Sequence, residues 1–379
     1  MDAAAKAARI FVALTARLKP CPDEGPWRRR CEFLGDFQSM GVGKKVGFAV
    51  VGLGTIAQGF VLPSFAKCKN AKLVAVVSRD KDKAARVGRK FKSNAHYSSE
   101  EYAACLANPE VDAVFVATPN GLHESFTVQA AQAGKHVLCE KPLAATAEQA
   151  ARMVEACRRN RVLLMTAYRK YFEPSSLFLK QLIQSGELGR IDLIHTAFSE
   201  LYSPGKSLAW LVDSNLAGGG PLMDLGVYCV NTSRWLVDED PVEVSAQSWA
   251  RDTVTFWDVE EGISFRLQFP SGLVVQGSAS YAAVLSSFLY VQGTKGWASL
   301  TPAFPFDEVR RLTGKIGKRA IDRTFPIMDE FGLEIKEFAS AIQNRRPVES
   351  DGVQGHRDMV ILESIYNSVR KQRPVVINY

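Results

Sequence analysis

A lysine, an aspartate and a tyrosine stand in two short segments that could together move a proton. Lys141 lies in a Glu-Lys-Pro sequence after a short apolar run, and Pro142 restricts the backbone that carries it. Asp224 and Tyr228 follow a Gly-Gly-Gly-Pro turn four residues apart, a spacing that puts both on one side of a helix. Tyrosine, with a pKa of about 10, is a poor base at neutral pH. Lys141 is the candidate to lower that pKa, and Asp224 could hold substrate hydroxyls or orient the tyrosine.

Each of these pieces also has an ordinary structural explanation. A Lys-Pro pair at the end of a strand is often only a solvated turn. A tyrosine four residues after an aspartate is more often a packing residue than a catalytic one. Their occurrence together with a nucleotide-binding pattern in the same chain is what favours catalysis.

The segment 46–79 has the pattern that a dinucleotide-binding unit needs. An apolar run at 46–51 predicts a buried parallel strand, and a helical stretch leads to a second apolar run at 73–77. Between them, glycine, glycine and alanine occur at G-x-G-x-x-A spacing, which allows a tight turn, close approach of a pyrophosphate and close helix packing. The helix N-terminus offers N–H groups to the phosphates. The predicted contacts are Gly52, Gly54, Thr55, Ile56 and Ala57.

The end of the second apolar run favours NADP over NAD. No acidic residue stands where an NAD enzyme would hold the ribose hydroxyls, and the run ends in Ser78-Arg79 with Lys83 nearby. These side chains could neutralise and hydrogen-bond a 2′-phosphate. Asp80 is an argument for NAD, but Arg79 precedes it.

Continued alternation of apolar runs and helices predicts an open, doubly wound parallel sheet with helices on both faces. Further strands are expected at 111–117, 136–139 and 162–166, and helices at 123–133 and 146–160. Ligands of such sheets bind beyond the carboxyl ends of the strands. The other predicted cofactor contacts are therefore Thr118, Pro119, Asn120, His123, Glu140, Lys141 and Arg169.

After residue 174 the pattern changes to that of a large, mostly antiparallel open sheet. Residues 263–269 alternate apolar and polar side chains, which is typical of a strand with one face in solvent. We expect helices on one face, and an oligomer interface on the other, which is rich in aromatic and small residues. Residues 301–328 fit no regular element. The remaining expected elements are helices at 175–184 and 353–370 and strands at 191–201, 273–281, 288–292, 297–300 and 373–376.

The fold class is therefore α/β, with a Rossmann domain at 45–167, a second α/β domain at 168–379 and an N-terminal arm at 1–44. Residues 1–45 carry nine Lys/Arg and five Asp/Glu, more than half of the net charge of +7, which leaves no basic face for nucleic acid. The seven cysteines form no C-x-x-C pair or His/Cys cluster, so reduced thiols and no metal are expected. The sequence contains no run of eighteen apolar residues, the length needed to span a membrane.

The predicted location is the cytoplasm. Three arginines at 28–30 could begin an export signal, but the residues that follow, GDFQSMGVGKK, are not apolar. A periplasmic location is the alternative.

Five segments resemble the Gfo/Idh/MocA oxidoreductase family, and its glucose-fructose oxidoreductase branch fits best. They are VGLGTIAQGFVLPSF, ATPNGLHESF, HVLCEKPLA, AYRKYFEPS and GGGPLMDLGVYCVN, and the resemblance extends over residues 46–379. It implies Lys141 as the family lysine, Tyr228 as the acid/base residue with Asp224 as its partner, and Ser78 and Lys83 at the NADP phosphate. The substrate-binding residues are expected to be Lys141, Tyr171, Trp210, Asp224 and Tyr228, with Tyr202 and Lys206 as further pocket candidates.

The resemblance implies an NADP-dependent oxidoreductase acting on a sugar or polyol, and a homodimer or homotetramer. The first hypothesis is hydride transfer from C1 of a cyclic aldose to the nicotinamide, giving a lactone, with possible return of the hydride to a second sugar. The alternative is a D-xylose 1-dehydrogenase or trans-dihydrodiol dehydrogenase with exchangeable NADP. A non-catalytic, cofactor-sensing regulator is a minor alternative, because that class is expected to lose Lys141 or Tyr228.

Overall fold

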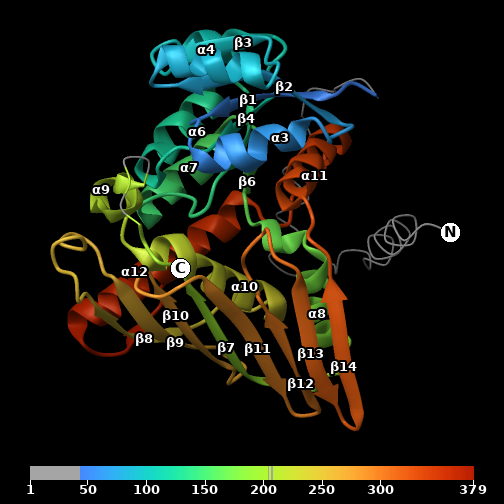
Figure 1. The fold of residues 1–379 in the computed structure, drawn as a ribbon, viewed down its shortest axis with the longest axis vertical. Helices are drawn as coiled ribbons and strands as arrows, with labels where there is room; N and C mark the ends of the chain where they lie inside the picture. Colours follow the sequence, from blue (N-terminus) through green and yellow to red (C-terminus); the bar gives the residue numbers. More distant parts are fainter. Residues whose placement is uncertain (1–42, 204, 206–207) are drawn as a thin grey trace.

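Two sheets, one parallel and one mostly antiparallel, organise the protein (Figure 1). The structure is a computed structural model that describes residues 43–203, 205 and 208–379. The predicted N-terminal arm lies outside these residues except for its last two positions, and so does Lys206.

The parallel sheet has the strand order β3-β2-β1-β4-β5-β6. Every residue of β1 is buried, which explains why its sequence is a continuous apolar run. The order reverses next to β1, as expected for a doubly wound sheet. The prediction missed β3, a short strand with little apolar surface to bury. The strands are β1 (Val46–Val51), β2 (Ala71–Ser78), β3 (Ala95–Ser98), β4 (Ala113–Val116), β5 (His136–Cys139) and β6 (Leu164–Thr166).

Short helices connect these strands, and side-chain caps fix where two of them begin. Thr146 and Gln149 form a capping box at the start of α7, and the Asp80 carboxylate accepts a hydrogen bond from the Lys83 amide at the start of α4. The helices of this half are η2 (Ala57–Val61), α3 (Leu62–Phe65), α4 (Lys81–Lys90), α5 (Tyr102–Ala107), η3 (Asn120–Leu122), α6 (His123–Gln132), α7 (Ala147–Arg159) and η4 (Arg169–Tyr171).

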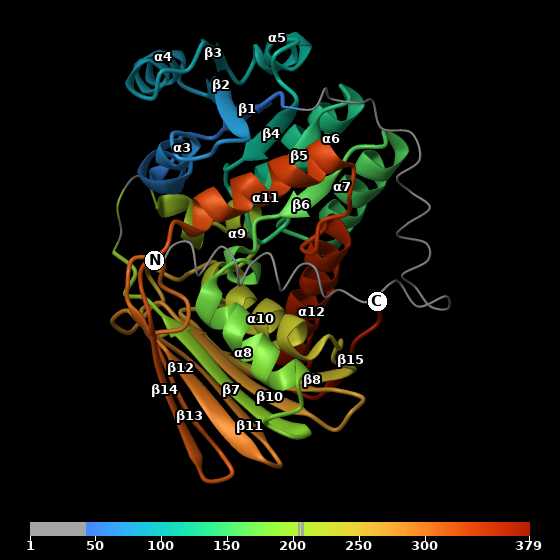
Figure 2. The same cartoon turned by 90° about the vertical axis from the view of Figure 1, so that its right-hand side faces the viewer.

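The second sheet has the order β14-β13-β12-β11-β7-β10-β9-β8-β15, and only β7 and β10 pair in parallel. Helices α8, α10 and α12 cover one face (Figure 2). The strands are β7 (Ile191–Ser199), β8 (Glu243–Trp249), β9 (Gly262–Gln268), β10 (Val274–Ser280), β11 (Ser286–Gly293), β12 (Gly296–Thr301), β13 (Arg310–Ile316), β14 (Arg319–Phe325) and β15 (Val375–Val376). The helices are α8 (Pro174–Gln184), η5 (Ala209–Val212), α9 (Ser214–Ala217), η6 (Leu222–Gly226), α10 (Val227–Val237), α11 (Glu330–Asn344) and α12 (Gly352–Lys371).

The hairpin of β13 and β14 corrects the expectation that residues 301–328 are irregular. The outer strand β14 is exposed along most of its length and carries arginine and aspartate where an apolar run would mark a strand. Such charged edge strands avoid pairing with other chains, and hydrophobic periodicity does not reveal them.

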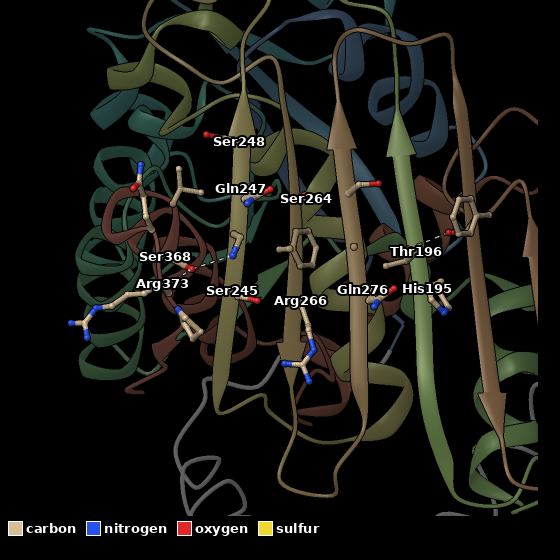
Figure 3. A pocket seen from close by; sticks show the side chains of 18 residues that line it. His195, Thr196, Ser245, Gln247, Ser248, Ser264, Arg266, Gln276, Ser368 and Arg373 are labelled. Carbon is tan, nitrogen blue, oxygen red and sulfur yellow. Dashed lines mark hydrogen bonds between the residues drawn. The ribbon is translucent and has the colours of Figure 1, made fainter.

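The uncovered face of the second sheet carries polar and aromatic side chains. The prediction of one wet face for β9 is confirmed, since Ile263, Phe265 and Leu267 are buried and the residues between them are not. A groove crosses this face, and His195, Arg266 and Gln276 project into it from neighbouring strands (Figure 3). It is lined by none of the residues predicted to bind cofactor or substrate.

Two C-terminal helices return to the first sheet. The helix α11 packs on β1 and α3, and α12 packs on α7 and β6 (Figure 2). Asp329, which caps α11, accepts a hydrogen bond of 2.7 Å from Ser64 of α3. In the part of the chain that the structure describes, no helix is long and apolar enough to cross a membrane. The cysteines of that part, Cys68, Cys105, Cys139, Cys157 and Cys229, are buried and unpaired.

Candidate active site

The glycine turn after β1 lies at the carboxyl edge of the parallel sheet. Gly52 has a φ of +89°, and a Cβ there would lie 2.4 Å from the carbonyl oxygen of Ala117, so only glycine fits. A Cβ on Gly54 would meet nothing within 4 Å, and Thr55 and Ile56 beside it are exposed. The turn therefore leaves open space at the start of a helix, which suits a bound pyrophosphate.

The loop after β2 carries basic side chains and an aspartate that already has a hydrogen-bond partner. Asp80 is engaged in capping α4, where it accepts a hydrogen bond of 2.9 Å from the Lys83 amide. The Ser78 hydroxyl accepts a hydrogen bond of 3.3 Å from the Asp80 amide, and Arg79 is exposed. The one carboxylate that argued for NAD is thus used within the protein.

Two residues predicted to contact the cofactor hold loops together instead. His123 is fully buried, with Nε2 2.8 Å from the Thr118 carbonyl oxygen and Nδ1 3.1 Å from that of Pro142. Burial lowers the pKa of His123, and the bonds to these carbonyls oppose that change. Asn120, also buried, donates a hydrogen bond of 2.8 Å to the Ala217 carbonyl. Neither side chain is exposed to a ligand. Motif position alone does not distinguish a residue that anchors loops from one that contacts the cofactor.

The turns after β4 and β5 do leave polar atoms without partners. Thr118 Oγ1 and Glu140 Oε1 are buried and have no hydrogen-bond partner among the described residues. Burial raises the pKa of Glu140, and Lys141 opposes the rise. Unpaired buried polar atoms at the carboxyl ends of parallel strands fit a site that a polar group completes. Pro119, which follows Thr118 in the turn after β4, is partly exposed.

Lys141 projects from the end of β5 onto the helix that carries Asp224 and Tyr228. Its Nζ donates hydrogen bonds to Asp224, at 2.8 Å to the carbonyl oxygen and 2.9 Å to Oδ1. The same Nζ lies 4.8 Å from the centroid of the Tyr228 ring. Burial alone would lower the pKa of Lys141, but Asp224 and then Tyr228 raise it above its usual value. Lys141 is therefore a fixed cation beside Tyr228.

Tyr228 is buried and has two cations near its ring. Its hydroxyl accepts a hydrogen bond of 3.0 Å from Arg169 Nε, and Phe198 and Phe304 pack against the ring. Burial raises the pKa of Tyr228, and Arg169 and Lys141 oppose the rise without reversing it. Lys141 thus lowers the pKa as predicted, but burial outweighs it, and the sequence gives no measure of desolvation. The hydroxyl is protonated at neutral pH, and its own proton is available to another acceptor.

Asp224 does not contact the Tyr228 hydroxyl. Besides Lys141, it accepts a hydrogen bond of 3.0 Å from the hydroxyl of Tyr281 at the end of β10. The expected role of orienting Tyr228 falls to Arg169. Asp224 holds Lys141, and its side chain is partly exposed.

Arg169, expected at the cofactor, is fully engaged inside the protein. Its Nη1 binds Glu330 at 2.6 Å and its Nη2 donates to the Phe304 carbonyl at 2.6 Å, while Nε donates to Tyr228. No local motif marks Glu330, Phe304 or Tyr281 in the sequence, so these residues were not predicted.

The two other predicted substrate contacts are not brought to this cluster. Tyr171 is buried, stacks on Trp235 at 4.7 Å between ring centroids, and accepts a hydrogen bond from Asn231. Both of these partners belong to α10. Trp210 lies in η5 and is partly exposed, and its expected contact with substrate stays a prediction. Tyr202 packs on Tyr281 and thus lies next to the partner of Asp224.

Comparison with known proteins finds relatives over most of the chain. The D-xylose 1-dehydrogenase [NADP(+)] of Haloarcula marismortui is 34% identical over 335 residues, which are 87% of this chain and 92% of that protein. The trans-1,2-dihydrobenzene-1,2-diol dehydrogenase of Mus musculus is 32% identical over 67% of this chain and 74% of its own length. The crystal structure of aldose-aldose oxidoreductase from Caulobacter crescentus, complexed with glycerol, is 33% identical, with a TM-score of 0.84 over 88% of this chain and 100% of that one.

Two family models match in succession along the chain. The oxidoreductase family with an NAD-binding Rossmann fold matches residues 46–168, and the GFO/IDH/MocA C-terminal domain matches residues 177–299. The glycine turn, the Lys141–Asp224 pair and the buried Tyr228 lie in these two matched segments. The chain therefore belongs to the Gfo/Idh/MocA family and is an NAD(P)-dependent oxidoreductase.

Proposed function

We propose that the protein oxidises C1 of a cyclic aldose to a lactone, using NADP. The observation that carries this proposal is the Tyr228 hydroxyl, held by Arg169 beside the Lys141–Asp224 pair where the two sheets meet. A buried proton-exchanging group flanked by fixed cations suits removal of a proton from an alcohol. Relatives named as xylose 1-dehydrogenase and aldose-aldose oxidoreductase support a sugar substrate.

The residues of the glycine turn and the following loop suit NADP. Gly52, Gly54 and the helix that starts at Thr55 would receive the pyrophosphate, and Ser78, Arg79 and Lys83 the 2′-phosphate. Asp80 accepts a hydrogen bond from the Lys83 amide, which engages one of its two oxygens at the start of α4. When bound, the nicotinamide supplies the acceptor for the hydride that leaves C1.

In this proposal Tyr228 accepts the proton of the anomeric hydroxyl as the C1–H bond breaks. The charges of Lys141 and Arg169 stabilise the tyrosinate, and Asp224 keeps Lys141 in place. Because burial raises the pKa of Tyr228, aldose oxidation should accelerate as pH rises above neutrality. In the opposite direction the protonated tyrosine donates to a carbonyl oxygen, and reduction should accelerate as pH falls.

The alternative is a xylose or dihydrodiol dehydrogenase whose NADP exchanges freely with solvent. A sugar-to-sugar oxidoreductase would instead retain its cofactor and return the hydride to a second sugar. The regulator hypothesis is the weakest, because Lys141 and Tyr228 are both present and Tyr228 is engaged with Arg169.

The test is the absorbance and fluorescence spectrum of the protein as purified, before and after addition of glucose. A nicotinamide signal that survives gel filtration and becomes reduced with glucose supports the retaining enzyme. A protein without such a signal that reduces added NADP with xylose or glucose supports an aldose dehydrogenase. Turnover of a dihydrodiol but of no aldose would refute C1 oxidation.

The cofactor preference is tested by comparing kcat/KM for NADP and NAD in wild type and Arg79→Ser. Loss of one charge–phosphate interaction should reduce the preference for NADP about tenfold. We also propose the division into a Rossmann domain at 45–167 and a substrate domain at 168–379, a cytoplasmic location, and a homodimer or homotetramer built through the uncovered face of the second sheet.

A further inference from the structure

A row of alternating buried charges runs from Tyr228 away from the cleft. Arg169 contacts Glu330, Glu330 contacts Arg310, Arg310 faces Glu173, and Glu173 binds Lys170. Their side chains are at most 4% exposed. They come from η4, α11, β13 and the N-cap of α8, so the row joins segments distant in sequence. Isolated buried charges are costly, and only mutual pairing makes this row tolerable.

Glu330 is the one member that binds two guanidinium groups. Its Oε2 lies 2.6 Å from Arg169 Nη1, and its Oε1 accepts a hydrogen bond from Arg310 Nη2. The residue begins α11, whose cap Asp329 is bound to Ser64 and paired with Lys67 of the nucleotide-binding half. These contacts hold the start of α11, and with it the backbone of Glu330, against the nucleotide-binding half.

Arg169 in turn has three acceptors at defined positions. Nη1 meets Glu330, Nη2 meets the Phe304 carbonyl, and Nε meets the Tyr228 hydroxyl. A planar guanidinium held at two ends has its third donor direction determined. Without Glu330 it is held by a carbonyl and a phenol alone, and it can turn within its plane.

We propose that Glu330 is a positioning residue for the reaction at Tyr228: it orients the Arg169 guanidinium toward the tyrosine hydroxyl and limits how strongly that charge acts on the hydroxyl. The inference rests on the proposed role of Tyr228 as the proton-exchanging group. Glu330 acts on Tyr228 through Arg169.

The charged groups that act on Tyr228 predict the direction of the effect. Arg169 and Lys141 lower the pKa of Tyr228 against the larger effect of burial, and Glu140 raises it. Asp224 binds Lys141, as Glu330 binds Arg169. Glu330→Gln keeps one carbonyl oxygen that can accept the hydrogen bond from Arg169 Nη1 and so hold its orientation, but it removes the negative charge and leaves Arg169 less compensated. The pKa of Tyr228 should then fall.

The experiment compares Glu330→Gln with wild type by two pH titrations. The first is kcat/KM for aldose oxidation, and the second is the ultraviolet absorbance of tyrosinate, taken as the difference from Tyr228→Phe. In both, Glu330→Gln should titrate at a lower pH by about one unit. Arg169→Met should titrate at a higher pH, since it removes the cation. Opposite shifts from two members of one ion pair are not expected of a structural defect.

Glu334 provides the matched control. It lies on α11 one turn beyond Glu330, is equally buried, and its carboxyl has no hydrogen-bond partner among the described residues. Burial, followed by the nearby Glu140, raises the pKa of Glu334 well above its usual value, and Arg169 opposes the rise, so we expect an uncharged carboxyl at neutral pH. Glu334→Gln replaces one neutral group by another and should leave both titrations unchanged.

Three outcomes decide the matter. If Glu330→Gln titrates as wild type does, or if Glu334→Gln shifts as far, Glu330 is not a positioning residue. If Glu330→Gln does not fold, Glu330→Asp keeps the charge, and an unchanged pKa with a lowered kcat supports the proposal while an unchanged kcat overturns it. If wild type oxidises no aldose but the absorbance titration still shifts, the proposed function fails and the positioning role stands.

Discussion

Two ion pairs flank Tyr228, and they differ in how far water reaches them. In the Lys141–Asp224 pair the side chains are 12% and 28% exposed, whereas in the Arg169–Glu330 pair they are 4% and 0% exposed. Each cation lies within 5 Å of the centre of the tyrosine ring, at 4.8 Å for Lys141 Nζ and 4.7 Å for Arg169 Cζ. The same phenol thus faces one cation from a partly exposed pair, Lys141–Asp224, which we call the cleft pair, and one from a buried pair, Arg169–Glu330, which we call the interior pair.

The difference assigns different tasks to the two pairs. A buried pair is expensive to form and expensive to break, so it keeps one geometry. A partly exposed pair is weaker and can exchange partners when a ligand arrives. Asp224 also accepts a hydrogen bond from Tyr281, so a substrate hydroxyl can replace Tyr281 while Lys141 stays bound. We infer that the interior pair fixes the tyrosine and that the cleft pair adapts to the substrate.

The largest effect is expected from removing the group that both pairs surround. Tyr228→Phe keeps the ring and its cation contacts but removes the hydroxyl, so kcat/KM for aldose oxidation should fall about 10³-fold or more. NADP affinity, measured by fluorescence titration, should change less than twofold. Activity within tenfold of wild type would show that another group exchanges the proton.

Breaking each pair from its cationic side separates them by stability. Arg169→Met leaves Glu330 buried with one partner fewer, and the free energy of unfolding should fall by about 3–5 kcal/mol. Lys141→Met leaves Asp224 with Tyr281 as a partner and with its side chain 28% exposed, so the loss should be smaller. Urea unfolding of both variants measures the difference. Equal losses would remove the distinction between an interior and a cleft pair.

The cleft pair should reveal itself in the pH dependence of the reaction. Lys141 lowers the pKa of Tyr228, so Lys141→Met raises that pKa further. Oxidation needs the deprotonated tyrosine, and its rate should therefore reach half its maximum at a pH about one unit higher. Asp224→Asn leaves Lys141 uncompensated and should move the same limb to lower pH. Shifts of equal sign in the two variants would contradict this account.

Both residues of the cleft pair stand in motifs that the sequence marks, whereas Glu330 of the interior pair does not. The bond between Lys141 and Asp224 was itself not predicted, since Asp224 was expected to orient Tyr228 or hold substrate hydroxyls. Lys141, Asp224 and Tyr228 stand in short motifs whose glycines and prolines fix the local backbone, so their types and spacing identify them. Arg169 and Glu330 are 161 residues apart, and a glutamate at the start of a helix is an ordinary capping-region residue. Only the packing of α11 against the site makes it a partner of Arg169.

The fold divides in the same way. The apolar runs of β1 and β5 predicted the parallel sheet, because strands buried on both faces have a distinct sequence. The β13–β14 hairpin was not predicted, because it has charged residues where an apolar run would mark a strand. These charges lie at the edge of the sheet and, for Arg310, in the row of buried charges. His123 was placed at the cofactor for its motif position, whereas the structure uses it to tie the loops after β4 and β5.

The smallest effect concerns the second partner of Asp224. Tyr281→Phe removes a hydrogen bond of 3.0 Å to Oδ2, worth about 1 kcal/mol, and keeps the ring that packs on Tyr202 and Phe256. If a substrate hydroxyl replaces Tyr281 at Asp224, removal of this competitor should appear as a KM up to about fivefold lower with kcat nearly unchanged. Tyr202→Phe is the control, because its hydroxyl bonds the Leu208 carbonyl and not Asp224. A fall in kcat with KM unchanged would mean that Tyr281 fixes Lys141 for the chemical step, and the cleft pair would then be as rigid as the interior one.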